Sequence, residues 1–236
     1  MFMKKLKPHL IVLTGAGVSA ESGIPTFRDA NGLWEGHRFE DVATPEAWQK
    51  DPKTVLRFYN ERRRAVRQAQ PNLAHKIIAE QENNFRITII TQNIDNLHEK
   101  AGSSNVVHLH GEILKSRSTK NESLVYNIEG DNIDYGEQCE LGSQLRPHIV
   151  WFGEAVPEIE RAAEITATAD YLMIVGTSLQ VYPAAGLINY APADCPILVV
   201  DPKSPQIAYL PNVKVIPKMA TEGVPEAFDY IKNTYL

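Results

Sequence analysis

The sequence predicts an α/β protein with a Rossmann-like, doubly wound parallel sheet and a smaller lobe formed by two insertions. Three observations predict this class. Short runs of Ile, Val and Leu alternate with longer helical patterns along the chain. Polar or glycine-rich residues follow several of the apolar runs directly. The length of 236 residues suits one α/β domain that carries a small subdomain.

The apolar runs predict six buried strands, because near-continuous Ile, Val and Leu content is typical of strands covered by helices on both faces. These strands are expected at residues 9–13, 86–90, 106–109, 171–175, 197–200 and 213–216. Helical patterns lie between them at residues 45–68, 71–81, 157–167, 184–190 and 224–233. In such a fold the ligand binds at the carboxyl ends of the strands, where we therefore expect the site.

Two insertions interrupt this alternation within a single domain of residues 1–236. The first covers about residues 32–73 and is mostly helical, and the second covers about residues 115–145 and is polar. We expect both to form the small lobe, held together by apolar side chains of the second insertion. The candidates are Leu124, Val125, Tyr126, Ile128, Ile133, Tyr135 and Leu141.

Charge and composition exclude several classes of partner. A net charge of −5 disfavours a general nucleic-acid or anionic-membrane binder, despite the local run Arg62-Arg63-Arg64. No segment approaches the roughly 20 apolar residues of a membrane span. Cys139 and Cys195 give no disulfide framework, so we expect a cytoplasmic protein. The oligomeric state stays unknown.

The first predicted strand runs into the string Leu-Thr-Gly-Ala-Gly-Val-Ser-Ala-Glu-Ser-Gly-Ile-Pro-Thr-Phe-Arg, residues 13–28. Gly15 and Gly17 let the backbone turn sharply and approach a ligand. A helix that opens just beyond them presents free N–H groups to a pyrophosphate. A bare Gly-x-Gly is equally compatible with a tight turn, but the longer string, with Glu21 and Gly23, is far more particular.

This string resembles the cofactor-binding signature of the sirtuins, the NAD-dependent protein lysine deacylases. Four further segments resemble motifs of that family in the same order: residues 91–98, 108–112, 146–154 and 176–178. Five ordered matches along most of the chain make chance a poor explanation. The resemblance implies an enzyme that acts on acylated-lysine proteins and converts NAD to nicotinamide and O-acyl-ADP-ribose.

The resemblance also assigns the catalytic residues, which are His110, Asn93 and Asp95. His110 would act as the base, Asp95 would bind nicotinamide, and Asn93 would lie near the ribose. Imidazole suits a base because its pKa lies near neutral pH. Taken alone, a histidine at a strand end is more often a buried side chain bonded to carbonyls, and Asn or Asp a helix cap. His108 should face away from His110.

The residues expected to bind the cofactor come from three motifs and from two further positions, Asp201 and Ala220. Asp201 follows a strand, where a carboxylate can bind ribose hydroxyls, although the family usually has an asparagine nearby. The full set is Gly15, Ala16, Gly17, Glu21, Phe27, Arg28, Gln92, Asn93, Ile94, Asp95, Gly176, Thr177, Ser178, Asp201 and Ala220.

Most sirtuins carry two Cys-x-x-Cys pairs in the second insertion, and the four thiolates hold a structural zinc. This chain keeps only Cys139. Ser118 stands near the place of the first ligand, and Gly142 near that of the last. We therefore expect no metal.

The acyl group is indicated by Tyr59 and Arg62, which are three residues apart and share one helix face. A phenol and a guanidinium together can bind a carboxylate. Their spacing resembles the Tyr-x-x-Arg pair of sirtuins that remove succinyl, malonyl or glutaryl groups, and Ala43 matches a small residue that widens the pocket there. Alternatively, Arg62 is one solvated charge in a basic run. Acetyl groups are not visibly excluded.

The segment that resembles the substrate-binding motif is expected to pair with the backbone of the acylated peptide through Val150, Phe152, Gly153 and Glu154. Two other functions remain open. ADP-ribosyl transfer or NAD hydrolysis would use the same glycosidic cleavage, and a non-enzymatic NAD sensor would use only binding. His110 and the complete substrate segment favour deacylation over both.

Overall fold

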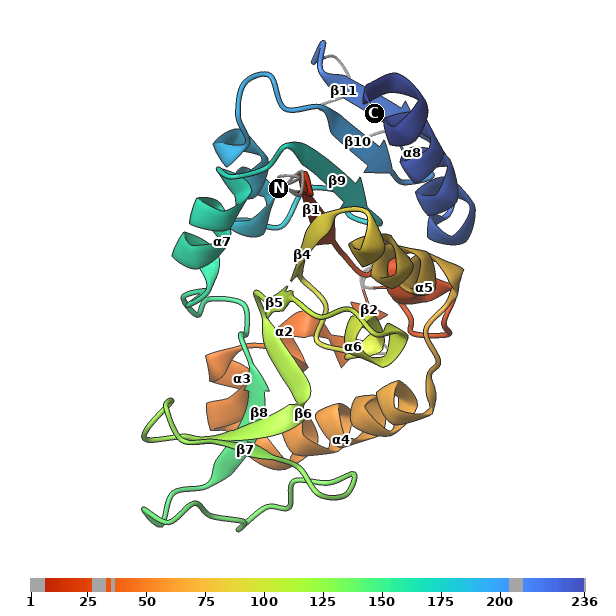
Figure 1. Ribbon diagram of the computed structural model, residues 1–236. Coiled ribbons are helices and arrows are strands. Elements are labelled where there is room, and N and C mark those ends of the chain that lie inside the picture. The colour runs from red at the N-terminus through yellow and green to blue at the C-terminus, as the bar shows by residue number, and fades with distance from the viewer. Residues whose placement is uncertain (1–6, 27–32, 35–36, 204–209, 236) are drawn as a thin grey trace, which may run out of the picture.

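The computed structural model of the protein describes residues 7–26, 33–34, 37–203 and 210–235 (Figure 1). Phe27 and Arg28, which we expect to contact the cofactor, lie outside these residues. Within the described part of the chain, no helix is both long enough and apolar enough to cross a membrane.

Six parallel strands form the main sheet, in the order β11-β10-β9-β1-β4-β5. The order reverses at β1, so the sheet is doubly wound as predicted. The strands are β1 (His9–Thr14), β4 (Arg86–Thr91), β5 (Val106–His108), β9 (Tyr171–Val175), β10 (Ile197–Val200) and β11 (Val213–Ile216). The predicted bounds are correct for the last three strands and differ by one residue for the others.

Helices cover both faces of this sheet (Figure 1). On one face, α5 (Leu73–Glu80) and α8 (Ala220–Tyr235) pack on alternate side chains such as Leu10 and Val12. On the other, α7 (Ile159–Thr166) and the 3-10 helix η2 (Ala184–Tyr190) pack on Ile11 and Leu13. The alternation along β1 therefore divides the core into two layers.

The first insertion begins with a hairpin of β2 (Leu33–Trp34) and β3 (His37–Arg38) and continues with α2 (Phe39–Val42). The single helix predicted at residues 45–68 is wrong, because α3 (Pro45–Lys50) and α4 (Pro52–Gln68) are separate. The Asp51 carboxylate accepts the Thr54 N–H at 3.1 Å and starts α4, and Pro52 occupies its first turn.

The second insertion forms an antiparallel sheet in the order β7-β6-β8, on which α4 packs. Its strands are β6 (Gly111–Ser118), β7 (Val125–Asn127) and β8 (Leu145–Ile149). Strand β6 begins before the predicted 115–145 range, and β8 ends after it. They therefore connect the small lobe directly to His110 and Val150, at the edge of the main sheet.

Hydrogen bonds join Ser118 and Cys139, which the resemblance places near expected zinc ligands, through Ser143. The Ser143 hydroxyl lies 2.7 Å from the Ser118 hydroxyl and 3.1 Å from the Cys139 sulfur. The Cys139 N–H also donates to the Ser143 carbonyl at 2.9 Å. Among the residues that the structure describes, no group of three or more His, Cys, Asp or Glu side chains is arranged to hold a metal.

The apolar packing of this lobe differs in part from the prediction. Ile133 is fully buried against Leu56, and Leu124, Tyr126 and Ile128 pack beside it. Val125, Tyr135 and Leu141 are exposed, so their prediction as core residues is wrong. Val125 lies on the edge strand β7, and the other two lie in loops, where apolar residues often remain at the surface.

Candidate active site

A cavity of about 470 Å³ opens at the carboxyl ends of β1, β4, β9 and β10, between the main sheet and the small lobe. This volume is in the range of small-molecule sites. Three segments that follow strands form its base, namely residues 15–17, 92–95 and 176–178, as the sequence predicts. The cavity continues to Asp201 and Ala220 on one side and to α4 on the other.

Gly15 and Gly17 are needed chiefly because they pack against a second turn. A Cβ on Gly15 would lie 2.7 Å from the Thr177 Cβ, and one on Gly17 would lie 2.6 Å from the Gly176 Cα. The Gly17 N–H donates to the Gly176 carbonyl at 2.9 Å. Two turns from opposite sides of the switch point therefore touch, which fixes the bottom of the cavity.

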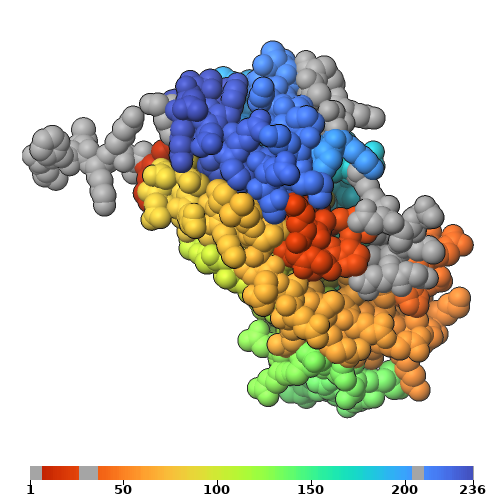
Figure 2. All heavy atoms as spheres, turned by 90° about the vertical axis from the view of Figure 1, so that its right-hand side faces the viewer, coloured from red at the N-terminus to blue at the C-terminus, as the bar shows by residue number. Residues whose placement is uncertain are grey.

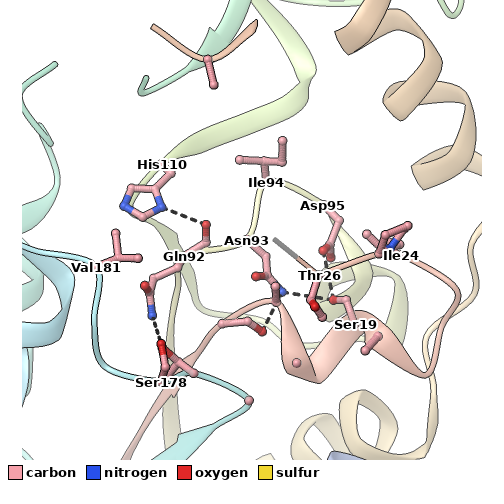
Figure 3. Close-up of a pocket in the computed structure, with 18 of the residues that line it drawn as sticks. Ser19, Ile24, Thr26, Gln92, Asn93, Ile94, Asp95, His110, Ser178 and Val181 are labelled. Carbon is pink, nitrogen blue, oxygen red and sulfur yellow. Dashed lines mark hydrogen bonds between the residues drawn. The ribbon is translucent and has the colours of Figure 1, made fainter. Parts of the chain in front are cut away.

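Asn93 and Asp95 are both buried and both bond to Ser19 (Figure 3). The Ser19 hydroxyl donates to the Asp95 carboxylate at 3.0 Å, and the Asn93 amide donates to the Ser19 hydroxyl at 3.1 Å. Asp95 also accepts the Leu97 N–H at 3.0 Å, so it satisfies the first N–H of α6 (Leu97–Ala101) while it faces the cavity. Burial raises the pKa of Asp95. The capping contact and the binding role are thus compatible.

His110 lies on the cavity wall where β5 leads into β6 (Figure 3). Its Nδ1 is 3.0 Å from the Gln92 carbonyl oxygen and donates to it, since a carbonyl can only accept. Nε2 is then the nitrogen available as a base. Partial burial lowers the pKa of His110, so the imidazole is neutral near pH 7. The Gln92 amide donates to the Thr177 hydroxyl at 3.1 Å and links the two loops.

His108 does face away from His110, as the alternation of a strand requires. Its two ring nitrogens contact the Asn93 carbonyl at 3.1 Å and the Glu99 carboxylate at 2.7 Å. His108 does not line the cavity. These bonds raise the pKa of His108 against the opposing effect of burial.

Glu21, which we expect to bind the cofactor, does not line the cavity and bonds to the start of α8. Its carboxylate accepts the Thr221 N–H at 3.0 Å and the Thr221 hydroxyl at 2.6 Å. This contact explains why α8 begins at Ala220, before the apolar pattern at Val224. Figure 2 shows the glycine-rich segment, in red-orange, against blue α8 and the orange first insertion.

Tyr59 and Arg62 lie on the wall of the same cavity as His110, together with Ala43. Tyr59 is fully buried and Arg62 is 5% exposed, so Arg62 is not a solvated charge. The Trp151 indole N–H donates to the Tyr59 hydroxyl at 3.1 Å. Burial raises the pKa of Tyr59, which stays protonated.

The segment after β8 also lines the cavity through Val150, Phe152, Gly153 and Glu154. The Val150 N–H donates to the His110 carbonyl and the Phe152 N–H to the Ala43 carbonyl, each at 3.0 Å. These two N–H groups are therefore already used within the protein. Any pairing with a substrate peptide depends on the other main-chain groups of the segment.

Glu154 is held by two arginines. Its carboxylate lies 2.6 Å from Arg146 and 3.4 Å from Arg117, and it accepts the Trp151 N–H at 2.8 Å. The Arg146 guanidinium stacks on the Trp151 ring, 3.3 Å from its centroid. Glu154 thus fixes Trp151, which in turn holds Tyr59. The sequence places Arg146 and Trp151 in the motif of residues 146–154 but does not predict the contacts that link them to Glu154 and Tyr59.

Comparisons with known proteins agree with this geometry. The family model of the Sir2 family matches residues 15–183. A protein named NAD-dependent protein deacylase from Bacteroides thetaiotaomicron is 51% identical over 223 residues, which cover 92% of this chain and 95% of the relative. A protein of the same name from Helicobacter pylori is 52% identical over 217 residues, covering 92% and 94%.

Solved structures are similar over nearly the whole chain. A crystal structure of a Sir2 homologue in complex with NAD has a TM-score of 0.86 and is 39% identical in sequence. The match covers 96% of this chain and 90% of that one. A Sir2 structure with a deacetylated p53 peptide and 3′-O-acetyl-ADP-ribose has a TM-score of 0.77 and 28% identity, covering 96% and 93%.

Proposed function

The chain belongs to the Sir2 family and is an NAD-dependent protein deacylase, and from that premise we propose that it prefers acyl groups that end in a carboxylate. Succinyl-, malonyl- and glutaryl-lysine are such substrates. One observation carries the proposal. A buried phenol and a buried guanidinium on one face of α4 line the cavity that His110 also lines.

The charges around the pocket support this preference. A guanidinium that is 5% exposed attracts an anion strongly, because water screens it little. Glu154 is a carboxylate on the same cavity wall, and Arg146 and Arg117 already bond to it. The carboxylate of a succinyl group would meet Arg62 and the Tyr59 hydroxyl, and Arg can bind a carboxylate through two parallel bonds.

The residues at the base of the cavity fit NAD. Gly15–Gly17 and Gly176–Ser178 leave main-chain edges without bulky side chains, and Asn93 and Asp95 add an amide and a carboxylate for the nicotinamide ribose and carboxamide. Asp201 and Ala220 would contact the other end of the molecule. When bound, NAD supplies the electrophilic ribose carbon that accepts the acyl oxygen.

His110 is the base in this proposal. The bond from its Nδ1 to the Gln92 carbonyl sets the tautomer in which Nε2 can take a proton. With NAD bound, His110 would take this proton from a ribose hydroxyl. Because burial lowers the pKa of His110, the base is in its active form at neutral pH.

The products of the wild-type protein test this function. We would incubate it with NAD and matched acetyl-, succinyl- and malonyl-lysine peptides and follow the products by mass spectrometry. We expect O-succinyl- and O-malonyl-ADP-ribose to form faster than O-acetyl-ADP-ribose. A faster acetyl reaction would contradict the preference. ADP-ribose without deacylated peptide would indicate NAD hydrolysis, and an ADP-ribosylated protein would indicate transfer.

The absence of zinc and a cytoplasmic location stay predictions of the same proposal. The free, buried state of Cys139 and Cys195 is compatible with a reducing compartment.

A further inference from the structure

Behind the cavity, three side chains and the main-chain N–H of Asn93 form a continuous buried line of hydrogen bonds. The Asn93 N–H donates to the Thr91 hydroxyl at 3.0 Å. The Thr14 hydroxyl donates to the Thr91 hydroxyl at 2.8 Å and lies 3.2 Å from His98 Nε2. Thr14 and Thr91 are the last residues of β1 and β4, and both are fully buried. His98 lies on α6 and is 2% exposed.

The direction of each bond follows from the donors available. Thr14 gives its single hydroxyl proton to Thr91, so it can only accept from His98. His98 must therefore carry its proton on Nε2. Burial lowers the pKa of His98 well below its usual value, which keeps the ring neutral and leaves Nδ1 without a proton. Nδ1 is a buried atom with no hydrogen-bond partner within the described part of the chain.

We infer that His98, Thr14 and Thr91 are positioning residues that hold the Asn93 main chain, and with it the loop of residues 92–95, in the geometry needed for NAD cleavage. None of the three lines the cavity. Asn93 itself reaches the Gly15 carbonyl at 3.2 Å and the Ser19 hydroxyl at 3.1 Å. A shift of its main chain would therefore disturb both sides of the site.

The inference rests on the proposed place of Asn93 in the nicotinamide-ribose end of the site. It predicts an effect on the rate of the chemical step rather than on binding of the acylated peptide. A displacement of about 1 Å far from the reacting atoms can slow a reaction up to about 10²-fold. The acyl preference should not change, because Tyr59 and Arg62 belong to another element.

Thr14→Val tests the line, since valine keeps the shape of threonine and removes both hydroxyl bonds. Thr88→Val is the matched control. Thr88 lies on β4, is 3% exposed and bonds to His9 at 3.0 Å and Asn105 at 2.7 Å, but it is outside the line to Asn93. Both variants should lower the melting temperature by similar amounts.

We expect Thr14→Val to lower kcat by about tenfold with acetyl and succinyl peptides alike, whereas Thr88→Val changes it by less than about twofold. KM for each peptide should stay near the wild-type value in both. Equal kcat for the two variants would overturn the inference. An acetyl preference of the wild-type protein would contradict the proposed acyl function and leave this comparison intact.

A second pair of variants covers the case in which Thr14→Val does not fold. His98→Phe fills the space of the ring without a donor, and His98→Gln keeps an amide N–H near the position of Nε2. We expect His98→Phe to lose kcat and His98→Gln to recover most of it. Equal losses in both would show that only packing matters there.

A double variant tests whether Asn93 is the target. Thr14→Val combined with Asn93→Ala should be no slower than Asn93→Ala alone, because the displaced main chain would act through the Asn93 side chain, which the second variant already lacks. If the loss of kcat in the double variant equals the product of the two single losses, Thr14 does not act through Asn93. An Asn93→Ala protein with wild-type kcat would refute the assigned role of Asn93 itself.

Discussion

His110, which we propose as the base, shows how one main-chain bond can set the tautomer of a histidine. The Gln92 carbonyl accepts from Nδ1 and leaves Nε2 for the substrate, and burial lowers the pKa. A base with a lowered pKa stays deprotonated further into the acid range, so its activity is lost only as the pH falls through the lowered pKa. The same effect makes His110 a weaker base than a free imidazole.

We therefore expect the acidic limb of the kcat/KM profile to lie below pH 6.5, where a free histidine titrates, and to disappear in His110→Ala. That variant should lose about 10²–10⁴-fold in kcat, as is usual when a general base is removed. NAD binding, measured by calorimetry, should largely remain because the main-chain contacts of residues 15–17 are unaffected. An acidic limb above pH 7, or near-normal turnover in the variant, would count against His110 as the base.

At the same scale, the sequence indicates residue identities better than it indicates contacts. Gly15, Asn93, Asp95 and His110 lie in one cavity as expected, because each follows a strand of a parallel sheet. Glu21 lies outside the cavity and bonds to Thr221. This contact is hard to predict because the two residues are 200 positions apart in the chain. Motif membership alone cannot distinguish a residue that touches the ligand from one that holds the next helix.

Helix α4 is the element on which the small lobe depends. Arg63 is fully buried and donates to the Ile113 carbonyl at 2.7 Å, the Asn60 side chain at 2.6 Å and the Asp131 carbonyl at 2.8 Å. Asn60 in turn exchanges two bonds with the main chain of Ile133. A charged side chain thus joins α4 to two distant parts of the small lobe.

We expect Arg63→Met to lower the free energy of unfolding by about 3 kcal/mol or more, since two buried acceptors and one part-buried acceptor lose a charged donor. Arg64→Met is the control. Arg64 is the next residue and bonds to Asn132 at 3.0 Å in an exposed position, so its loss should cost less than about 1 kcal/mol. Urea unfolding of both variants measures the difference. Similar values for the two would show that Arg63 does not hold the lobe.

The hydrogen bonds of Ser118, Cys139 and Ser143 lead to a second prediction for the small lobe. If these residues replace a metal site, the purified protein should contain no stoichiometric zinc, and a chelator should leave its melting temperature unchanged. Elemental analysis and a thermal scan with and without the chelator provide the measurement. About one zinc per chain, or a large loss of stability with the chelator, would refute this account of the lobe.

Sequence patterns predict an element best where its cause is local. Most residues of the main-sheet strands are apolar, and β9, β10 and β11 have the predicted bounds. The apolar pattern does not reveal the break between α3 and α4, because it continues across Asp51-Pro52, the residues that mark the break. The core of the small lobe is predicted only in part, because burial there depends on α4 and not on residue type.

At the scale of the whole molecule, the cavity joins two parts of the chain with different tasks. The main sheet supplies the loops that fit NAD, and the small lobe supplies Ala43, Tyr59 and Arg62. His110 and Val150 stand where strands of the small lobe leave the main sheet. The fold class could be predicted from the order of strands and helices, whereas this junction depends on contacts between distant segments.

In the proposed function, acyl preference and NAD cleavage use different elements, so a variant can change the preference and keep the cleavage. Arg62→Met should therefore lose roughly 2–5 kcal/mol of succinyl-lysine recognition, as when one partner of a buried charge pair is removed. Acetyl-lysine has no carboxylate, so its turnover should change far less. Tyr59→Phe should shift selectivity in the same direction by a smaller amount.

The ratio of kcat/KM for matched succinyl and acetyl peptides, measured in competition for wild type, Arg62→Met and Arg64→Met, tests the central claim most directly. Arg64 has the same charge but bonds to Asn132 and does not line the cavity. We predict that the ratio swings towards acetyl in Arg62→Met and stays at the wild-type value in Arg64→Met. Equal losses on both peptides in Arg62→Met would show that Arg62 is structural and would contradict the carboxylate pocket.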